Sequence, residues 1–169
     1  YLTAITWSPD SKFIFVGVLN RDQNHLKMNQ YDAVTGNLVK TLFEETSDKY
    51  VEPQHPLLFF PNSNTDFIWQ SQRTGYNHLF HYSLEKGLVA QITKGDWLVT
   101  DILGFNEKKK EIYYTSTQES PLERHLYRIN WNNFKTQKLS AAPGMHTGIL
   151  SKDGTQLYDI YSNATTPRS

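Results

Sequence analysis

The chain has 169 residues, and its 17 Lys and Arg residues balance 17 Asp and Glu residues, so no basic excess is available for a nucleic acid or an anionic membrane. Cysteine is absent, which excludes disulfides, thiolate nucleophiles and cysteine-based metal sites. The longest apolar run, Phe13–Leu19, is much shorter than the roughly 20 residues of a membrane-spanning helix, so we expect no membrane span. The 4 Trp, 10 Tyr and 9 Phe residues favour strands and predict an all-β fold.

One pattern recurs four times along the chain: an apolar residue, a polar turn, and an apolar residue that opens a strand. The four copies are Trp7–Val16, Phe60–Trp69, Phe105–Tyr114 and Leu150–Asp159. Between them, His-Leu pairs open three further short strands, at His25, His78 and His125. The copies start 45 to 53 residues apart, which is the period of β-propeller blades.

These elements group into units of four antiparallel strands. The approximate bounds of the units are 2–46, 56–95, 97–140 and, for a partial unit, 145–162. A blade of this kind buries its faces only against neighbouring blades. The sequence therefore predicts a partial β-propeller of about three and a half four-stranded antiparallel blades. A β-sandwich is the competing all-β architecture, but it does not predict four matching segments.

The same pattern predicts that the chain is a segment of a larger propeller domain. Its first residues, Tyr1–Trp7, contain no Met and no charged leader, and its last unit has only two expected strands. Apolar side chains of that last unit, including Ile149, Leu157 and Tyr158, would then lack a covering neighbour. We therefore expect the isolated fragment to self-associate.

Motifs for catalysis or cofactor binding are missing from the sequence. There is no Gly-x-Ser-x-Gly, no Gly-x-Gly-x-x-Gly and no Gly-x-x-x-x-Gly-Lys, so we expect no catalytic residue and no cofactor in this chain. His78 and His81 are three residues apart, but in a strand they point to opposite faces and cannot share one metal ion. We interpret His25, His78 and His125 as structural hydrogen-bonding residues and expect no metal site.

The segment Tyr50–Pro56 joins the first two units and is the longest stretch outside the repeat. Loops on a rigid scaffold often carry binding residues, so Tyr50, Glu52 and His55 are our candidates for a substrate pocket. The alternative is that this segment is only a rigid connector between blades. The four Trp residues fit strand positions that pack between blades, and Lys108–Lys110 fits a solvated hairpin tip.

Several segments resemble the propeller domain of the dipeptidyl peptidase IV family. They are Thr93–Val99, Glu111–Thr117 and Ser120–Arg128. Ser71–Leu79 resembles a blade motif of the same family, Ser-x-x-x-Gly-Tyr/Trp-x-His-Leu. Bacterial members, including prolyl tripeptidyl peptidases, are similar at Tyr1–Trp7 and Tyr50–Pro53. The resemblance covers essentially the whole chain.

The resemblance implies a parent serine peptidase of the prolyl oligopeptidase type, with a C-terminal α/β-hydrolase domain that carries the Ser, Asp and His triad. Such enzymes release a dipeptide or tripeptide from a free N-terminus, after Pro or Ala. The present segment would be non-catalytic and would gate and dock peptide substrates, and the stretch matching Tyr50–His55 shapes the pocket in some relatives. A periplasmic or extracellular location is also implied.

The family's paired glutamates hold the substrate ammonium and sit on a short helical insertion. Glu44–Glu45 is the one Glu-Glu pair in this sequence, but it lies at the end of an expected strand, where the family has no such insertion. No role is therefore transferred to it. A second hypothesis is a stand-alone propeller-type binding or scaffold module with no attached enzyme. The two hypotheses differ in whether the parent reading frame continues into Gly-x-Ser-x-Gly.

Overall fold

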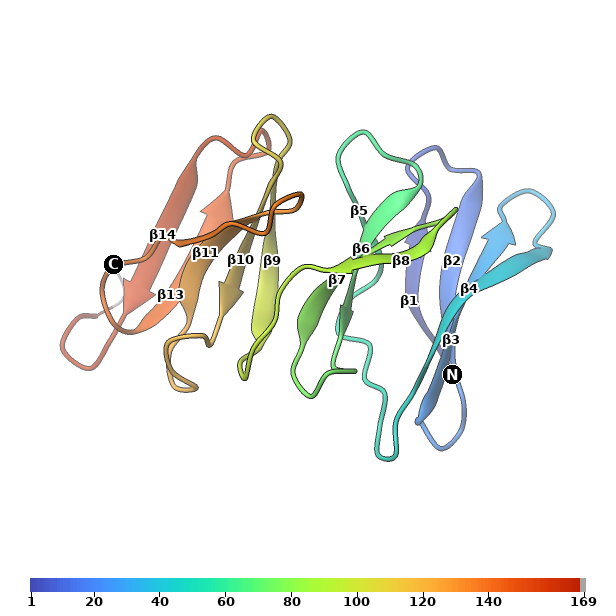
Figure 1. Cartoon of the computed structure of the whole chain (residues 1–169), viewed down its shortest axis with the longest axis horizontal. Coiled ribbons are helices and arrows are strands. Elements are labelled where there is room, and N and C mark those ends of the chain that lie inside the picture. Colours follow the sequence, from blue (N-terminus) through green and yellow to red (C-terminus); the bar gives the residue numbers. More distant parts are fainter. Residues whose placement is uncertain (168–169) are drawn as a thin grey trace. The chain divides into compact units, whose positions relative to one another are not determined.

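The computed structural model describes residues 1–167, in which fourteen strands form four antiparallel sheets (Figure 1). Three sheets have four strands and one has two, and in each of them strands that follow one another in sequence are hydrogen-bonded neighbours. That part of the chain contains no helix, and so none that could cross a membrane. The predicted fold class, an all-β partial propeller built from four-stranded antiparallel sheets, is confirmed.

The strand bounds follow the sheets in chain order. The first sheet consists of β1 (Leu2–Trp7), β2 (Phe13–Leu19), β3 (His25–Asp32) and β4 (Leu38–Thr46). The second consists of β5 (Leu58–Phe59), β6 (Asp66–Ser71), β7 (His78–Ser83) and β8 (Gly87–Gln91). The third consists of β9 (Val99–Asn106), β10 (Glu111–Ser116), β11 (His125–Asn130) and β12 (Thr136–Lys138). The two-stranded sheet consists of β13 (Met145–Leu150) and β14 (Leu157–Ser162).

Short polar turns close the hairpins of the repeated pattern. In the first copy the Ser8 amide donates to the carbonyl of Phe13 at 2.9 Å, and the Ser8 hydroxyl donates to Asp10 at 2.7 Å. The last copy repeats this arrangement, since the Ser151 hydroxyl donates to Asp153 at 2.6 Å. Gly154 follows with a φ of 69°, a conformation that costs glycine little. The side-chain hydrogen bonds explain why these polar residues recur between apolar strands.

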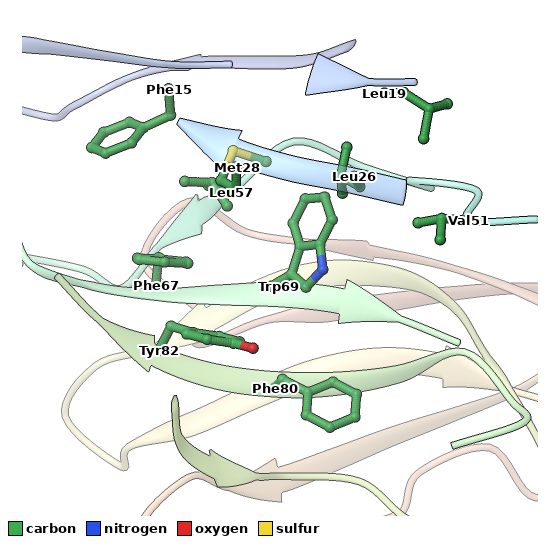
Figure 2. Close-up of a cluster of buried hydrophobic side chains, with 10 residues drawn as sticks. All are labelled: Phe15, Leu19, Leu26, Met28, Val51, Leu57, Phe67, Trp69, Phe80 and Tyr82. Carbon is green, nitrogen blue, oxygen red and sulfur yellow. The ribbon is translucent and has the colours of Figure 1, made fainter. Parts of the chain in front are cut away.

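The chain forms two compact units, residues 1–91 and residues from 92 onward. In the first unit, the sheets β1–β4 and β5–β8 share one apolar core (Figure 2). Trp69 of β6 is fully buried in this core, together with Phe15, Leu26 and Met28 of the first sheet. Val51, from the segment that joins the sheets, lies in the same cluster. Each sheet therefore supplies the apolar cover for one face of the other.

Aromatic rings make up much of that core. The ring of Tyr82 stacks on Phe43 at 4.6 Å and on Phe67 at 5.7 Å between centroids. Phe43 also contacts Trp69 at 5.4 Å. Aromatic pairs in such geometries add to the stabilisation that comes from burial alone.

The second unit packs the β13–β14 hairpin against the sheet β9–β12. The two buried histidines His125 and His146 have ring centroids 5.0 Å apart, and His146 stacks on Tyr161 at 5.2 Å. Gly148 lies where a Cβ atom would overlap side-chain atoms of Leu103 and Leu126. A larger residue at 148 would thus require these leucine side chains to shift.

The strand bounds show where the His-Leu pairs and the four Trp residues lie. The His-Leu pairs do open strands, because His25, His78 and His125 are the first residues of β3, β7 and β11. The prediction that all four Trp residues lie in strands is wrong for two of them. Trp97 and Trp131 lie in turns, and Trp7 is in β1 with 55% of its surface exposed. Aromatic content identifies strand-rich chains but does not assign each ring to a core position.

Replacing Leu26 by Ala tests the core of the first unit. Leu26 has no exposed surface and belongs to the cluster of Figure 2, so Leu26→Ala should lower the free energy of unfolding by about 2–5 kcal/mol. Val34→Ala is the control, because Val34 is 93% exposed, and it should change stability little. Urea unfolding monitored by Trp fluorescence measures both. Equal effects of the two substitutions would contradict the assigned core.

The buried tyrosines predict loss of stability at alkaline pH. Burial raises the pKa of four phenols above the ordinary value of 10.0, those of Tyr82, Tyr113, Tyr114 and Tyr127. A phenol whose pKa is raised by folding contributes its full stabilisation below pH 10, and that contribution falls as pH rises further because only the unfolded chain ionises readily. Absorbance of the phenolate should therefore show a late group of tyrosines that ionises together with unfolding. Titration of all ten tyrosines near pH 10 with the fold intact would contradict this.

Candidate functional site

A hollow of about 560 Å³ opens in the first unit, where β4 ends and the β6–β7 loop begins. Its lining consists of the continuous run 45–52 together with Gln72 and Arg73. The run 45–52 contains the end of β4 and the start of the connector, the name used here for residues 47–57 between β4 and β5. Most of these lining side chains are polar or charged, so the hollow offers hydrogen-bonding groups more than apolar surface.

Two backbone hydrogen bonds and two buried side chains, those of Val51 and Leu57, hold the connector in place. The Ser47 amide donates to the carbonyl of Asn24 at 3.0 Å, and the Val51 amide donates to the carbonyl of Gln23 at 2.8 Å. The Val51 side chain enters the core of the unit (Figure 2). With Val51 directed inward, its neighbours Tyr50 and Glu52 are left exposed at the hollow.

The structure brings together two of the three residues predicted from the sequence. Tyr50, with 68% of its surface exposed, and Glu52 both line the hollow. His55 is exposed and lies outside the lining. Two prolines, at 53 and 56, flank the stretch that carries His55 and fix the backbone angle φ there.

An ion pair between the two sheets forms part of the lining. The Arg73 guanidinium donates to the carboxylate of Glu45, whose side chain is only 9% exposed. The indole N–H of Trp69 donates to the same carboxylate oxygen at 2.7 Å. Glu45 is in β4, whereas Trp69 is in β6 and Arg73 follows it in the β6–β7 loop, so the contacts join the two sheets of the unit.

Arg73 is itself fixed by three other contacts. Its Nε donates to the hydroxyl of Ser71 at 3.1 Å, and its Nη1 donates to the hydroxyl of Tyr82 at 2.6 Å. The guanidinium also lies 4.6 Å from the centroid of the Phe80 ring, a cation–π arrangement. Sequence reasoning missed both Glu45 and Arg73. Arg73 could have been noticed because it lies within the Ser71–Leu79 motif, but no residue near it in the sequence indicates that Glu45 is its partner.

Both members of the Glu44–Glu45 pair are engaged within the protein. Glu44 contacts the imidazole of His25 at 2.5 Å and the Lys27 ammonium at 3.4 Å, and the hydrogen bond with His25 holds the pKa of Glu44 below its ordinary range. Glu45 is paired with Arg73. Both carboxylates therefore have partners within the protein.

A serine, a histidine and a glutamate meet in the second unit. The Ser140 hydroxyl lies 2.8 Å from Nδ1 of His125, and Nε2 of His125 lies 2.8 Å from the Glu123 carboxylate. Because the Leu126 amide donates to Ser140, the serine hydroxyl proton is available to His125. This is the residue set of a nucleophilic relay, but Ser140 is 4% and His125 1% exposed, and none of the three lines the hollow. Its geometry is that of a structural clamp at the start of β11.

Two other histidines, His81 and His146, are also paired with carboxylates within the protein. His81 contacts the Asp66 carboxylate at 2.8 Å and the edge of the Phe60 ring. His146 contacts the Asp159 carboxylate through Nδ1 at 2.7 Å and the Ala142 carbonyl through Nε2 at 2.7 Å. Within residues 1–167, no group of three His, Asp or Glu residues is arranged to hold a metal ion. None of these histidines is among the residues that line the hollow.

The family model described as the dipeptidyl peptidase IV (DPP IV) N-terminal region matches residues 1–168. A "Probable dipeptidyl peptidase 4" of Aspergillus flavus is 34% identical over 145 residues, covering 80% of this chain and 18% of that protein. A dipeptidyl-aminopeptidase B of Aspergillus niger is 31% identical over 157 residues, covering 84% of this chain and 17% of that protein. The chain thus spans about a fifth of the length of these curated relatives.

Two solved structures are similar over almost the whole chain. A crystal structure from Bacteroides ovatus, described as that of a dipeptidyl aminopeptidase IV, has a TM-score of 0.92 at 41% identity, and covers 99% of this chain and 26% of that one. The dipeptidyl peptidase 4 of Porphyromonas gingivalis has a TM-score of 0.88 at 26% identity, with 99% and 24% covered.

The structural interpretation of Ser140 predicts the result of one substitution. Ser140→Ala leaves His125 Nδ1 and the Leu126 amide without their partner, so it should lower the free energy of unfolding by about 1–3 kcal/mol. A fluorophosphonate probe should not label Ser140 in the folded chain, because the hydroxyl is inaccessible. Peptide mapping after labelling measures this. Modification of Ser140 in the native protein, absent after urea denaturation, would contradict the structural role.

Proposed function

This chain belongs to the dipeptidyl peptidase IV N-terminal region family, and we propose that it is the non-catalytic propeller segment of a serine exopeptidase that gates and docks peptide substrates. The parent enzyme then removes dipeptides or tripeptides after proline or alanine, and a C-terminal α/β-hydrolase domain supplies its nucleophile. The absence of Gly-x-Ser-x-Gly from the present sequence is in keeping with this division.

The hollow beside the connector is the observation that carries the docking role. It combines an exposed aromatic ring, a carboxylate and backbone held at fixed positions by buried anchors. A peptide presents N–H and C=O groups along its backbone, and these groups are complementary to a polar lining. Tyr50 and Glu52 are proposed to contact the substrate, and His55 to lie at the outer end of the same connector.

The stand-alone binding module remains the alternative function. The matched dipeptidyl peptidases are several times longer than this chain, which favours the peptidase segment. Reading the gene downstream separates the two, because a peptidase segment must be followed by Gly-x-Ser-x-Gly with later Asp and His. A stop codon soon after residue 169, with no such motif, would support the binding module.

Substitution of Tyr50 in the full-length gene product tests the docking role. Tyr50→Ala should raise KM for Ala-Pro and Gly-Pro peptides by roughly 10-fold and leave kcat little changed, because a docking residue contributes binding that is equal in the ground and transition states. Glu52→Gln should act in the same direction with a smaller effect. Steady-state kinetics with a series of peptides of increasing length measures both parameters.

Val34→Ala is the control for this experiment. Val34 is 93% exposed, lies between β3 and β4, and is not part of the lining of the hollow. It should leave KM and kcat unchanged. Equal kinetics of the Tyr50→Ala and wild-type proteins, with every peptide length, would remove the docking role of the connector.

A further inference from the structure

We infer that the Glu45–Arg73 ion pair is a positioning device for the connector, and thereby sets the shape of the hollow beside it. This inference rests on the proposed function only for its consequence for peptides; its structural part concerns Arg73 and residues 45–52. Both members of the pair belong to the lining, and both sit at points where the chain leaves a strand.

The Glu45 carboxylate needs a cationic partner. Its side chain is 9% exposed, and a carboxylate removed from water is costly unless it is paired and hydrogen-bonded. The carboxylate oxygen accepts from Trp69 and from Arg73, and only the latter supplies a compensating charge. Loss of Arg73 would leave a largely buried anion with a single neutral donor, which favours rotation of Glu45 towards water.

Arg73 holds the Glu45 carboxylate in one orientation. Its guanidinium uses three different nitrogens for three acceptors, Ser71, Tyr82 and Glu45, and its face lies on the Phe80 ring. The planar fork is therefore fixed in orientation by β6 and β7. Lysine at this position could keep the charge but could not reach three acceptors at once.

Glu45 lies close in sequence to the first anchor of the connector. Only Thr46 separates Glu45 from Ser47, whose amide is the first anchor of the connector, and the next anchor, at Val51, lies four residues further on. If Glu45 rotates out, the end of β4 loses its attachment to the β6–β7 loop, while the Val51 side chain still holds the far end. The run between the two anchors, which carries Tyr50, should then become locally mobile.

Amide hydrogen exchange of the chain tests this directly. Arg73→Met should speed exchange at Ser47 and Val51 by about 10-fold or more, while the strand amides of β6 and β7 keep their protection. Arg73→Lys should restore part of the protection, and Glu45→Gln, which keeps an acceptor for Trp69, should give an intermediate rate. If Arg73→Met does not fold, exchange in Arg73→Lys and Glu45→Gln tests the positioning role instead.

A second ion pair provides the matched control. Arg128 donates to the Glu111 carboxylate at 3.2 Å in the second unit, with side chains 27% and 15% exposed, against 27% and 9% for Arg73 and Glu45. Arg128→Met should leave exchange at Ser47 and Val51 unchanged. The inference is overturned by unchanged exchange in all three variants of the Glu45–Arg73 pair. An equal rise throughout the chain, which would indicate general destabilisation, also overturns it.

Kinetics of the same variants in the full-length gene product separates this inference from the proposed function. A raised KM together with faster connector exchange supports both. Faster connector exchange with unchanged KM keeps the positioning role and counts against the docking of peptides at this hollow. Unchanged exchange with a raised KM would mean that Arg73 contacts the peptide itself, and would overturn the positioning role.

Discussion

The apolar interface between the sheets β1–β4 and β5–β8 is the constraint on which the first unit depends. A twisted antiparallel sheet with an apolar face must cover that face, and here Trp69, Phe67 and Tyr82 of one sheet meet Phe15 and Met28 of the other. Packing the sheets together also brings their ends together. The end of β4 and the start of the β6–β7 loop become neighbours for this reason, and the hollow is a consequence of core packing rather than an independent feature.

The fold could be predicted from the sequence because its signals are local. An apolar residue, a polar turn and a strand opener recur at a blade-like period, and each copy can be recognised without knowledge of the others. The candidate site could be predicted only in part. Tyr50 and Glu52 stand out because they interrupt the repeat, whereas Glu45 and Arg73 lie inside repeated elements and are joined across 28 positions by tertiary packing. Composition also could not show that Trp97 and Trp131 lie in turns.

Some groups of side chains have the residue types of an active site, but in the structure these side chains hydrogen-bond to one another or to the backbone. Ser140, His125 and Glu123 satisfy one another and a backbone amide at the start of β11, and Glu44 is paired with His25 and Lys27. Buried polar groups must find partners wherever a chain folds, so a short contact between complementary residues is weak support for catalysis. Accessibility distinguishes the two interpretations: Ser140 and His125 are buried, whereas Tyr50 and Glu52 at the hollow are exposed.

Under the proposed function, a polar hollow on a rigid sheet scaffold would bind the peptide while a separate domain carries out the reaction. Contacts remote from the reacting bond can hold a peptide in register, and they bind it more tightly when the groups that make them are already fixed before the peptide arrives. A connector anchored by Val51 at one point and held beside the Glu45–Arg73 pair at another meets that requirement without any reactive group. Under the proposed function, the demand on this segment is therefore for geometric precision, and an ion pair with several fixed donors provides it better than a flexible apolar contact would.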